Sequence, residues 1–225
     1  MNHINWEKYV DAIYGIHFLH YKNRRVEFEI ELDYMDILHS PIFKYHFTYP
    51  NVFDKVVLDN YKPTFRDYNN ERVNLVTSVT LAYHSIFREA QELGYRKICI
   101  IEDDIRFLHD KTKWIQVLDH LPEKWDFIQF DMILNHENHS RLQTLQRGAW
   151  FHSNYTGGYW GAAFCFWSKN AIDFSVQQQE SEFTVCDYLL ANRDDPRLAS
   201  LKRFVPAHHL MWQASQPEKY WKLEY

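Results

Sequence analysis

The sequence predicts a single α/β domain with a mixed, mainly parallel central sheet flanked by helices. Three observations favour this class: strand-like and helix-like segments alternate, the 225 residues fit one domain, and no Ser- or Gly-rich linker divides them. Hydrophobic residues make up 46% of the chain and charged residues 24%, as in ordinary globular proteins. This composition excludes a disordered, collagen-like or coiled-coil chain.

Six short apolar segments are predicted as strands. The clearest is 98–101, an unbroken Ile-Cys-Ile-Ile run typical of a strand buried on both faces of a parallel sheet. The other five are 14–19, 55–58, 126–130, 161–167 and 204–207.

The clearest predicted helix covers 74–93. Its apolar residues recur at three- and four-residue steps and give one apolar stripe: Leu75, Val79, Ala82, Ile86, Ala90 and Leu93. Asn74 is a suitable N-cap, and Gly94 a suitable stop. Segment 26–32 fits a strand or a helix, and we favour the helix. The remaining predicted helices are 111–121, one from Lys169 capped by Ser168, and 183–192.

Charge and motif content exclude several function classes. The net charge of -5 argues against a nucleic-acid binder, and no glycine-rich phosphate loop is present. The three cysteines, Cys99, Cys165 and Cys186, form no CxxC pair, so we expect buried free thiols rather than a thiolate zinc site. No secretory signal or membrane span is found, so we expect a soluble cytoplasmic protein, with peripheral membrane association left open.

Three acids directly follow the strand at 98–101. Because ligands of open α/β sheets bind at the carboxyl ends of strands, Glu102, Asp103 and Asp104 are candidates for a site. Alternation along an extended chain places Glu102 and Asp104 on one side, where they could hold Mg²⁺ or Mn²⁺. A solvated acidic turn is an equally good interpretation.

Other candidates carry weaker signals. Arg24 and Arg25 could bind a diphosphate or form a solvated basic turn. His208 and His209 follow a strand and could supply a metal ligand. Asp187 interrupts an apolar helical stretch, as an exposed or a cleft-facing residue would. The aromatic loop 154–161 suits a sugar platform or a packed hairpin.

The chain resembles glycosyltransferase family 25, the lipooligosaccharide and collagen galactosyltransferase type. Segment 93–104, LGYRKICIIEDD, is similar to the family's glycine, apolar strand and acidic element. His84 matches one member of its Ser-His pair, while Tyr83 stands in place of the serine. The other similar segments are 14–25, 125–130, 157–168 and 204–213.

The resemblance implies a GT-A fold, a Rossmann-like domain with a nucleotide-binding half at 1–105 and an acceptor-binding half at 106–225. It implies a metal-dependent hexosyl- or pentosyltransferase that uses Mn²⁺ or Mg²⁺. The donor would be a UDP- or GDP-linked sugar, the acceptor a glycan or another hydroxyl, and the outcome inverting. Nucleic acid is not expected as a partner.

Each implied role has candidate residues. The expected metal ligands are Asp104, Glu102 and His209. The expected nucleotide-sugar ligands are Asp103, Gly15, Arg24, Arg25, Ser78 and His84. Gly158, Tyr159 and Trp160 are expected at the sugar or acceptor. An acceptor hydroxyl needs a carboxylate to take its proton, and the expected bases are Asp187 first and Asp131 second.

Two further function classes stay open from the sequence. A metal-dependent phosphohydrolase or nuclease could use the same acids, although the net charge of -5 disfavours a nuclease. A noncatalytic carbohydrate-binding module would explain the aromatic residues but would not need the acidic triplet.

Overall fold

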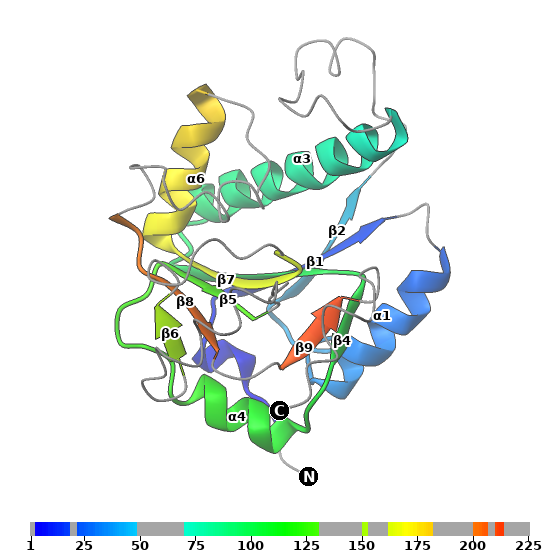
Figure 1. Cartoon of the computed structure of the whole chain (residues 1–225), viewed down its shortest axis with the longest axis vertical. Coiled ribbons are helices and arrows are strands. Elements are labelled where there is room, and N and C mark those ends of the chain that lie inside the picture. Colours follow the sequence, from blue (N-terminus) through cyan, green and yellow to red (C-terminus); the bar gives the residue numbers. More distant parts are fainter. Residues whose placement is uncertain are drawn as a thin grey trace, which may run out of the picture.

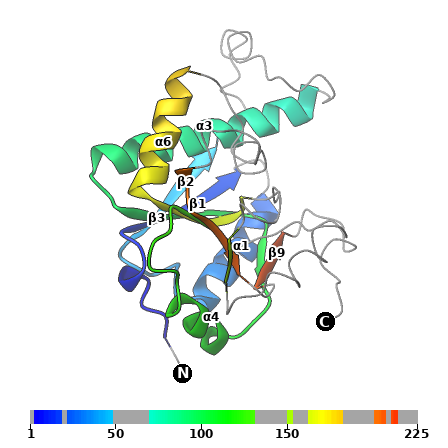
Figure 2. The ribbon, with the colours of Figure 1, turned by 60° about the vertical axis from the view of Figure 1, so that its left-hand side comes forward.

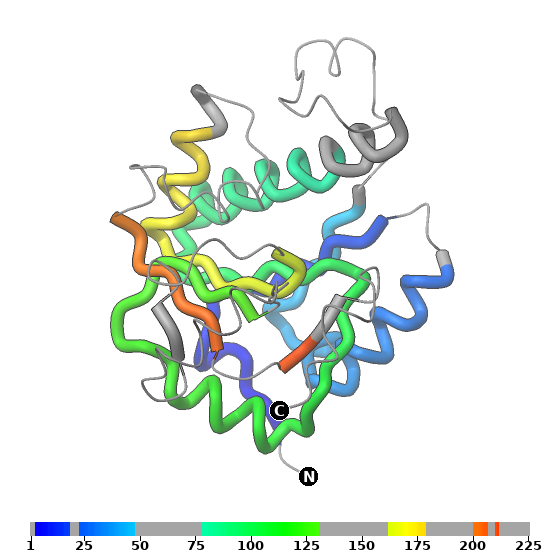
Figure 3. The backbone as a smooth tube through the Cα atoms, viewed as in Figure 1, coloured from blue at the N-terminus to red at the C-terminus, as the bar shows by residue number. Residues whose placement is uncertain are grey.

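The computed structural model describes residues 3–18, 22–48, 70–130, 150–152, 162–181, 200–206 and 210–213. The predicted strand at 55–58 and the predicted helix at 183–192 lie outside the described residues. Figure 1 shows the arrangement of the elements, and Figure 3 traces the same path as a tube.

The strands are β1 Ala12–Phe18, β2 Phe43–Thr48, β3 Lys97–Glu102, β4 Ile105–Phe107, β5 Phe127–Gln129, β6 Trp150–His152, β7 Phe164–Ser168, β8 Arg203–Pro206 and β9 Met211–Gln213. The helices are the 3₁₀ turn η1 Trp6–Lys8, α1 Lys22–Tyr34, α3 Asn70–Glu92, α4 Lys111–Leu118 and α6 Lys169–Ser181.

The central sheet has seven strands in the order β2-β1-β3-β7-β5-β8-β6, and β4 pairs with β9 in a separate two-stranded sheet. Strands β2, β1 and β3 run parallel. Strand β7 is antiparallel to both β3 and β5, β8 is parallel to β5, and β6 is antiparallel to β8. Among the described strands of this sheet, β7 and β6 alone run against the common direction, which confirms the predicted mixed, mainly parallel sheet.

Helices cover both faces of this sheet (Figures 1 and 2). On one face α3 and α6 bury Ala82, Ile86 and Ile172 against the strands. On the other face α1 and α4 bury Phe28 and Trp114. Burial of apolar area on two faces is the main stabilising contribution in such a three-layer fold.

Strand β3 lies between β1 and β7, and its apolar run serves both layers. Cys99 and Ile101 pack into the core under α1 and α4, whereas Ile98 and Ile100 pack into the core under α3. Side chains alternate along a strand, so a strand covered on both faces needs apolar residues at every position. The prediction of a doubly buried strand is confirmed.

Helix α3 begins at Asn70, four residues before the expected start. The prediction that Asn74 is its N-cap is wrong, because the helical hydrogen-bonded turns continue on its amino-terminal side. The predicted stop is confirmed: Gly94 adopts a φ of 70°, and the Tyr95 amide donates to the Ala90 carbonyl at 2.9 Å. A left-handed residue at this position is the usual helix ending, and glycine adopts it without steric cost.

Helix α1 confirms the favoured helical interpretation of 26–32, but it begins at Lys22. Arg24 and Arg25 therefore belong to the start of this helix, which excludes the alternative of a solvated basic turn. At the start of α6, Ser168 accepts a 3.4 Å hydrogen bond from the Ala171 amide, as its predicted capping role requires. None of the helices in the described ranges has the length and apolar character needed to cross a membrane.

Candidate functional site

The carboxyl ends of β1 and β3 meet at one edge of the sheet. The two strands are parallel neighbours, and Ile16 pairs with Glu102 in their register. After Glu102 the chain turns through Asp103 and Asp104 into β4. Ligands of α/β sheets bind at this kind of edge, so the acidic turn is the candidate site.

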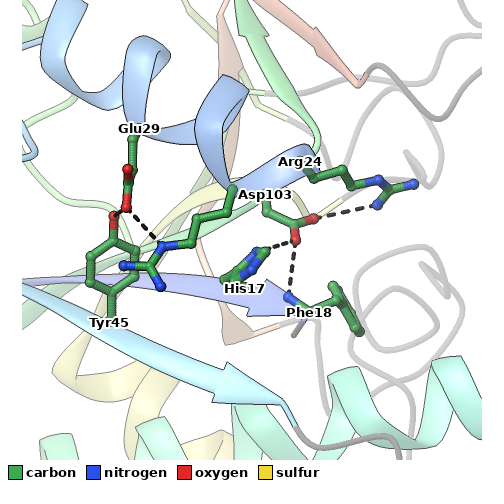
Figure 4. Close-up of polar contacts among 7 residues, drawn as sticks. His17, Phe18, Arg24, Glu29, Tyr45 and Asp103 are labelled. Carbon is green, nitrogen blue, oxygen red and sulfur yellow. Dashed lines mark hydrogen bonds and ion pairs between the residues drawn. The ribbon is translucent and has the colours of Figure 1, made fainter. Parts of the chain in front are cut away.

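Asp103 is 1% exposed and points towards the end of β1 and the start of α1 (Figure 4). Its Oδ2 lies 2.7 Å from Nδ1 of His17 and accepts a 2.9 Å hydrogen bond from the Phe18 amide. Its Oδ1 lies 3.4 Å from Arg24 Nη1. A carboxylate accepts, so the His17 ring donates from Nδ1. Both carboxylate oxygens of Asp103 therefore face donors of the protein, and the side chain points into the protein interior.

Glu102 lies on the opposite face of the strand, beside α3. The Tyr83 hydroxyl donates to the Ala162 carbonyl at 2.5 Å and lies 3.1 Å from Oε1 of Glu102. Tyr83 is the residue that stands in place of the serine in the family pattern. Its buried phenol links α3, the approach to β7 and the first acid of the turn.

Asp104 is 7% exposed. Burying a carboxylate costs free energy unless a cation or hydrogen-bond donors compensate it. Glu102 and Asp104 both offer oxygen ligands of the kind that Mg²⁺ and Mn²⁺ prefer. Asp103 does not fit as a third ligand, since its oxygens contact His17, Phe18 and Arg24. Within the described ranges, no three Cys, His, Asp or Glu side chains gather closely enough to form a metal site by themselves.

The two arginines of α1 have different surroundings. Arg24 is one-third exposed, and its described ion-pair partner is Asp103. Arg25 donates from Nε to Glu29 at 2.9 Å, and its guanidinium lies over the Tyr45 ring at 5.6 Å from the ring centroid. The hydrogen bond from Arg25 is the main cause that lowers the pKa of Glu29. Arg24, rather than Arg25, lies at the acidic turn.

Gly15 lies within β1 and is explained by packing. A Cβ atom added there would lie 2.9 Å from the Phe43 ring and 3.2 Å from the Phe28 ring. The glycine therefore lets β2 and α1 close over β1. The expected role of Gly15 at the nucleotide stays a prediction.

Two expected nucleotide ligands lie on α3. Ser78 is 7% exposed, and His84 is half-buried one residue after Tyr83. Six expected residues lie outside the described residues, and their roles stay predictions: Asp131, Gly158, Tyr159, Trp160, Asp187 and His209.

Two features of the site were not predicted from the sequence: the contact of His17 with Asp103, and the pairing of β9 with β4 next to the acidic turn. His17 lies in the predicted strand 14–19, one residue before its observed end, so a parallel partner strand would have placed it near Asp103. Strand β9 pairs with β4 so that Gln213 lies opposite Ile105, directly after the acidic turn. The pairing joins segments that are about a hundred residues apart in the chain, and no local pattern reports it.

Comparison with known proteins identifies the fold. No protein-family model matches the chain, and no characterised protein matches it by sequence. The structure is similar to a glycosyltransferase involved in the glycosylation of the major capsid of PBCV-1, with a TM-score of 0.51, 10% identity and coverage of 92% of this chain and 94% of that one. Mouse xyloside xylosyltransferase 1 gives a TM-score of 0.39 at 8% identity, with 81% and 79% coverage, which does not establish a shared fold. The chain thus has a glycosyltransferase-like fold, while the family 25 resemblance stays a prediction.

Proposed function

We propose that this protein is a metal-dependent glycosyltransferase that moves a sugar from a nucleotide-diphosphate donor to a hydroxyl acceptor. The observation that carries the proposal is the acidic turn at the carboxyl end of β3, next to the end of β1. Its place in the sheet is where ligands of α/β folds bind. The similarity in fold to a glycosyltransferase supports the same conclusion.

In this proposal Asp104 and Glu102 hold Mn²⁺ or Mg²⁺. The metal, when bound, acts as a Lewis acid towards the diphosphate leaving group. Tyr83 restrains Glu102 through its 3.1 Å contact, and the buried turn keeps Asp104 at the edge of the sheet. His209 is the proposed third ligand.

Arg24 is proposed to bind the diphosphate. Its guanidinium carries two NH₂ groups and one NH, and it is one-third exposed beside Asp103. Asp103 fixes Arg24, His17 and the Phe18 amide, so we assign it a positioning role instead of the expected contact to the donor. Fixed positive charge near developing negative charge lowers the barrier to leaving-group departure.

The acceptor hydroxyl requires a base, and Asp187 remains our first choice, with Asp131 second. Strand β5 ends at Gln129 at the same edge of the sheet, two residues before Asp131. Tyr159 and Trp160 are proposed to frame the sugar. An inverting outcome, UDP or GDP as the nucleotide, and a hexosyl or pentosyl group belong to the same proposal.

Thermal-shift screening of UDP- and GDP-sugars with and without Mn²⁺ tests this proposal. A ligand that binds only the native state raises apparent stability, so one donor class should stabilise the wild type only when Mn²⁺ is present. Asp104→Asn should remove this shift, and the matched surface variant Asp33→Asn should retain it. Asp33 is two-thirds exposed on α1, away from the turn.

Product analysis then separates the function classes. Transfer of sugar to an added glycan supports the proposal. Release of phosphate or nucleotide without any sugar acceptor would instead indicate a phosphohydrolase. Sugar binding that a chelator leaves unchanged, with no turnover, would indicate a noncatalytic module.

A further inference from the structure

An open cavity lies at the opposite edge of the sheet from the acidic turn. Its volume is about 480 Å³. Its walls come from the amino ends of β3 and β8, the segment before β5, and the start of α6. These segments lie together at the left of Figure 1. Known ligand pockets span roughly 300–1,000 Å³, so this volume suits one small molecule or a headgroup.

The cavity is strongly basic, although the chain as a whole has a net charge of -5. The lining includes two acids, Glu123 and Asp126. The basic residues of the lining are Arg96, Lys97, Lys124, Lys169 and Lys202. The excess is therefore three positive charges, and a concave surface with one sign of charge concentrates ions of the other sign.

Asp126, whose negative charge is included in that excess, uses both of its carboxylate oxygens within the protein. It is 8% exposed, its Oδ1 accepts from the Ser168 hydroxyl at 3.0 Å, and its Oδ2 accepts from the Lys202 amide at 2.9 Å. Both carboxylate oxygens are used to join the ends of β7 and β8. This acid shapes the cavity and leaves the lysine side chains for a ligand.

Four of the five basic groups form no ion pair with an acid in the described part of the chain: Arg96, Lys97, Lys124 and Lys202. Of these, Lys97 lies over the Trp125 ring at 5.5 Å, whereas the fifth group, Lys169, pairs with Asp173 at 2.5 Å. Like charges that face one cavity repel each other, and a bound anion relieves that repulsion.

The start of α6 adds to this positive field. The helix has 13 residues, and no acid lies in its first turn. The amino end of a helix carries a partial positive charge that proteins often neutralise with Asp or Glu. Here a lysine and Asn170 occupy the first two positions and both line the cavity.

We infer that this cavity is a second binding site, for a ligand that carries a phosphate group. Lysine and arginine contacts suit a phosphate dianion, and the volume leaves room for the group that bears it. The site needs no metal and lies at the amino ends of the parallel strands, so it is separate from the proposed donor site. The phosphate could belong to a free phosphorylated metabolite or to a lipid headgroup.

The first experiment is an NMR titration of the ¹⁵N-labelled full chain with inorganic phosphate, in metal-free buffer. We expect saturable shifts of the Lys97, Asn170 and Lys202 amides, and none at Asp104. The double variant Lys124→Gln/Lys202→Gln should bind phosphate at least tenfold more weakly. The control double variant Arg88→Gln/Lys113→Gln removes the same charge at residues that do not line the cavity, and it should bind like the wild type.

The second experiment identifies the source of the phosphate. Co-sedimentation with phosphatidylcholine vesicles containing phosphatidic acid is compared with pure phosphatidylcholine vesicles. If the acidic vesicles retain the wild type but not the cavity double variant, the phosphate belongs to a lipid headgroup. Phosphate binding with no retention indicates a soluble ligand. Both results support the site.

Three results would overturn the inference. The first is that phosphate shifts no amide signals and the acidic vesicles retain no protein. The second is that the wild type and the cavity double variant bind phosphate equally. The third is that the phosphate-induced amide shifts vanish in Asp104→Asn but persist in the cavity double variant. Unfolding midpoints of the variants serve as the folding control. None of these readouts depends on sugar transfer, so a failure of the proposed enzyme function would be recognised separately.

Discussion

Oδ2 of Asp103 lies 2.7 Å from Nδ1 of His17, and both side chains are at most 2% exposed. The contact joins the end of β1 to the turn after β3. Asp103 therefore faces protein donors, whereas our proposal gives Asp104 the different task of binding a metal at the same turn. Variants of Asp103 and Asp104 test this difference, because the first should affect mainly stability and the second mainly activity.

Asp103→Ala should lower the free energy of unfolding by about 3 kcal/mol, because it leaves the buried His17 ring and the Phe18 amide without their acceptor. Urea unfolding measures the loss. Asp104→Asn should cost less than half as much stability and abolish sugar transfer. If Asp103→Ala were as stable as the wild type, the positioning role would be wrong.

Asp36 should make stability depend on pH in the acid range. Burial alone would raise the pKa of Asp36, but hydrogen bonds from Lys111 and the Ile4 amide outweigh it and lower the pKa below its ordinary 3.8. A folded-state pKa below the unfolded one stabilises the protein above the unfolded pKa, and this contribution disappears as pH falls through the folded pKa.

Asp36→Asn removes that contribution while keeping the polar side chain that tolerates the φ of 59°. Its free energy of unfolding should fall below the wild type by about 1–2 kcal/mol at pH 7 and equal it near pH 2. Urea unfolding at a series of pH values measures both. Asp33→Asn is the control, and a constant difference between wild type and Asp36→Asn at every pH would contradict the prediction.

Gly15→Ala should destabilise the protein by about 1–2 kcal/mol, because its methyl group would lie 2.9 Å from the Phe43 ring. Thermal unfolding measures the effect. Phe43→Leu makes room for the methyl group, so the double variant should lose less stability than the sum of the single variants. Strict additivity would show that Phe43 is not the obstacle.

Gly94→Ala should cost about 1 kcal/mol through backbone strain alone, since the φ is 70° and no atom lies within 4 Å of the added Cβ. Gly94→Asn should cost less, because Asn adopts the left-handed region more readily. Chemical denaturation ranks the three proteins. A stable Gly94→Ala variant would mean that the end of α3 rearranges freely.

Several features could be predicted from local pattern. The apolar run of β3 predicted a strand covered on both faces, and Gly94 predicted where α3 ends. The acids were placed at the carboxyl end of that strand for the same reason. The start of α3 and the first turns of α1 were not predicted, because polar residues such as Asn70 and Arg24 give weak signals at helix boundaries.

Local sequence patterns are sufficient to predict the alternation of strands and helices, the doubly buried strand and the position of the acidic turn. These features depend on side-chain periodicity over a few residues. Three other features depend on long-range packing: His17 contacts Asp103, β7 runs antiparallel to its neighbours, and Gln213 lies opposite Ile105. They could not be predicted because strand register depends on how distant segments cover each other's apolar faces, and no short stretch of sequence contains that information.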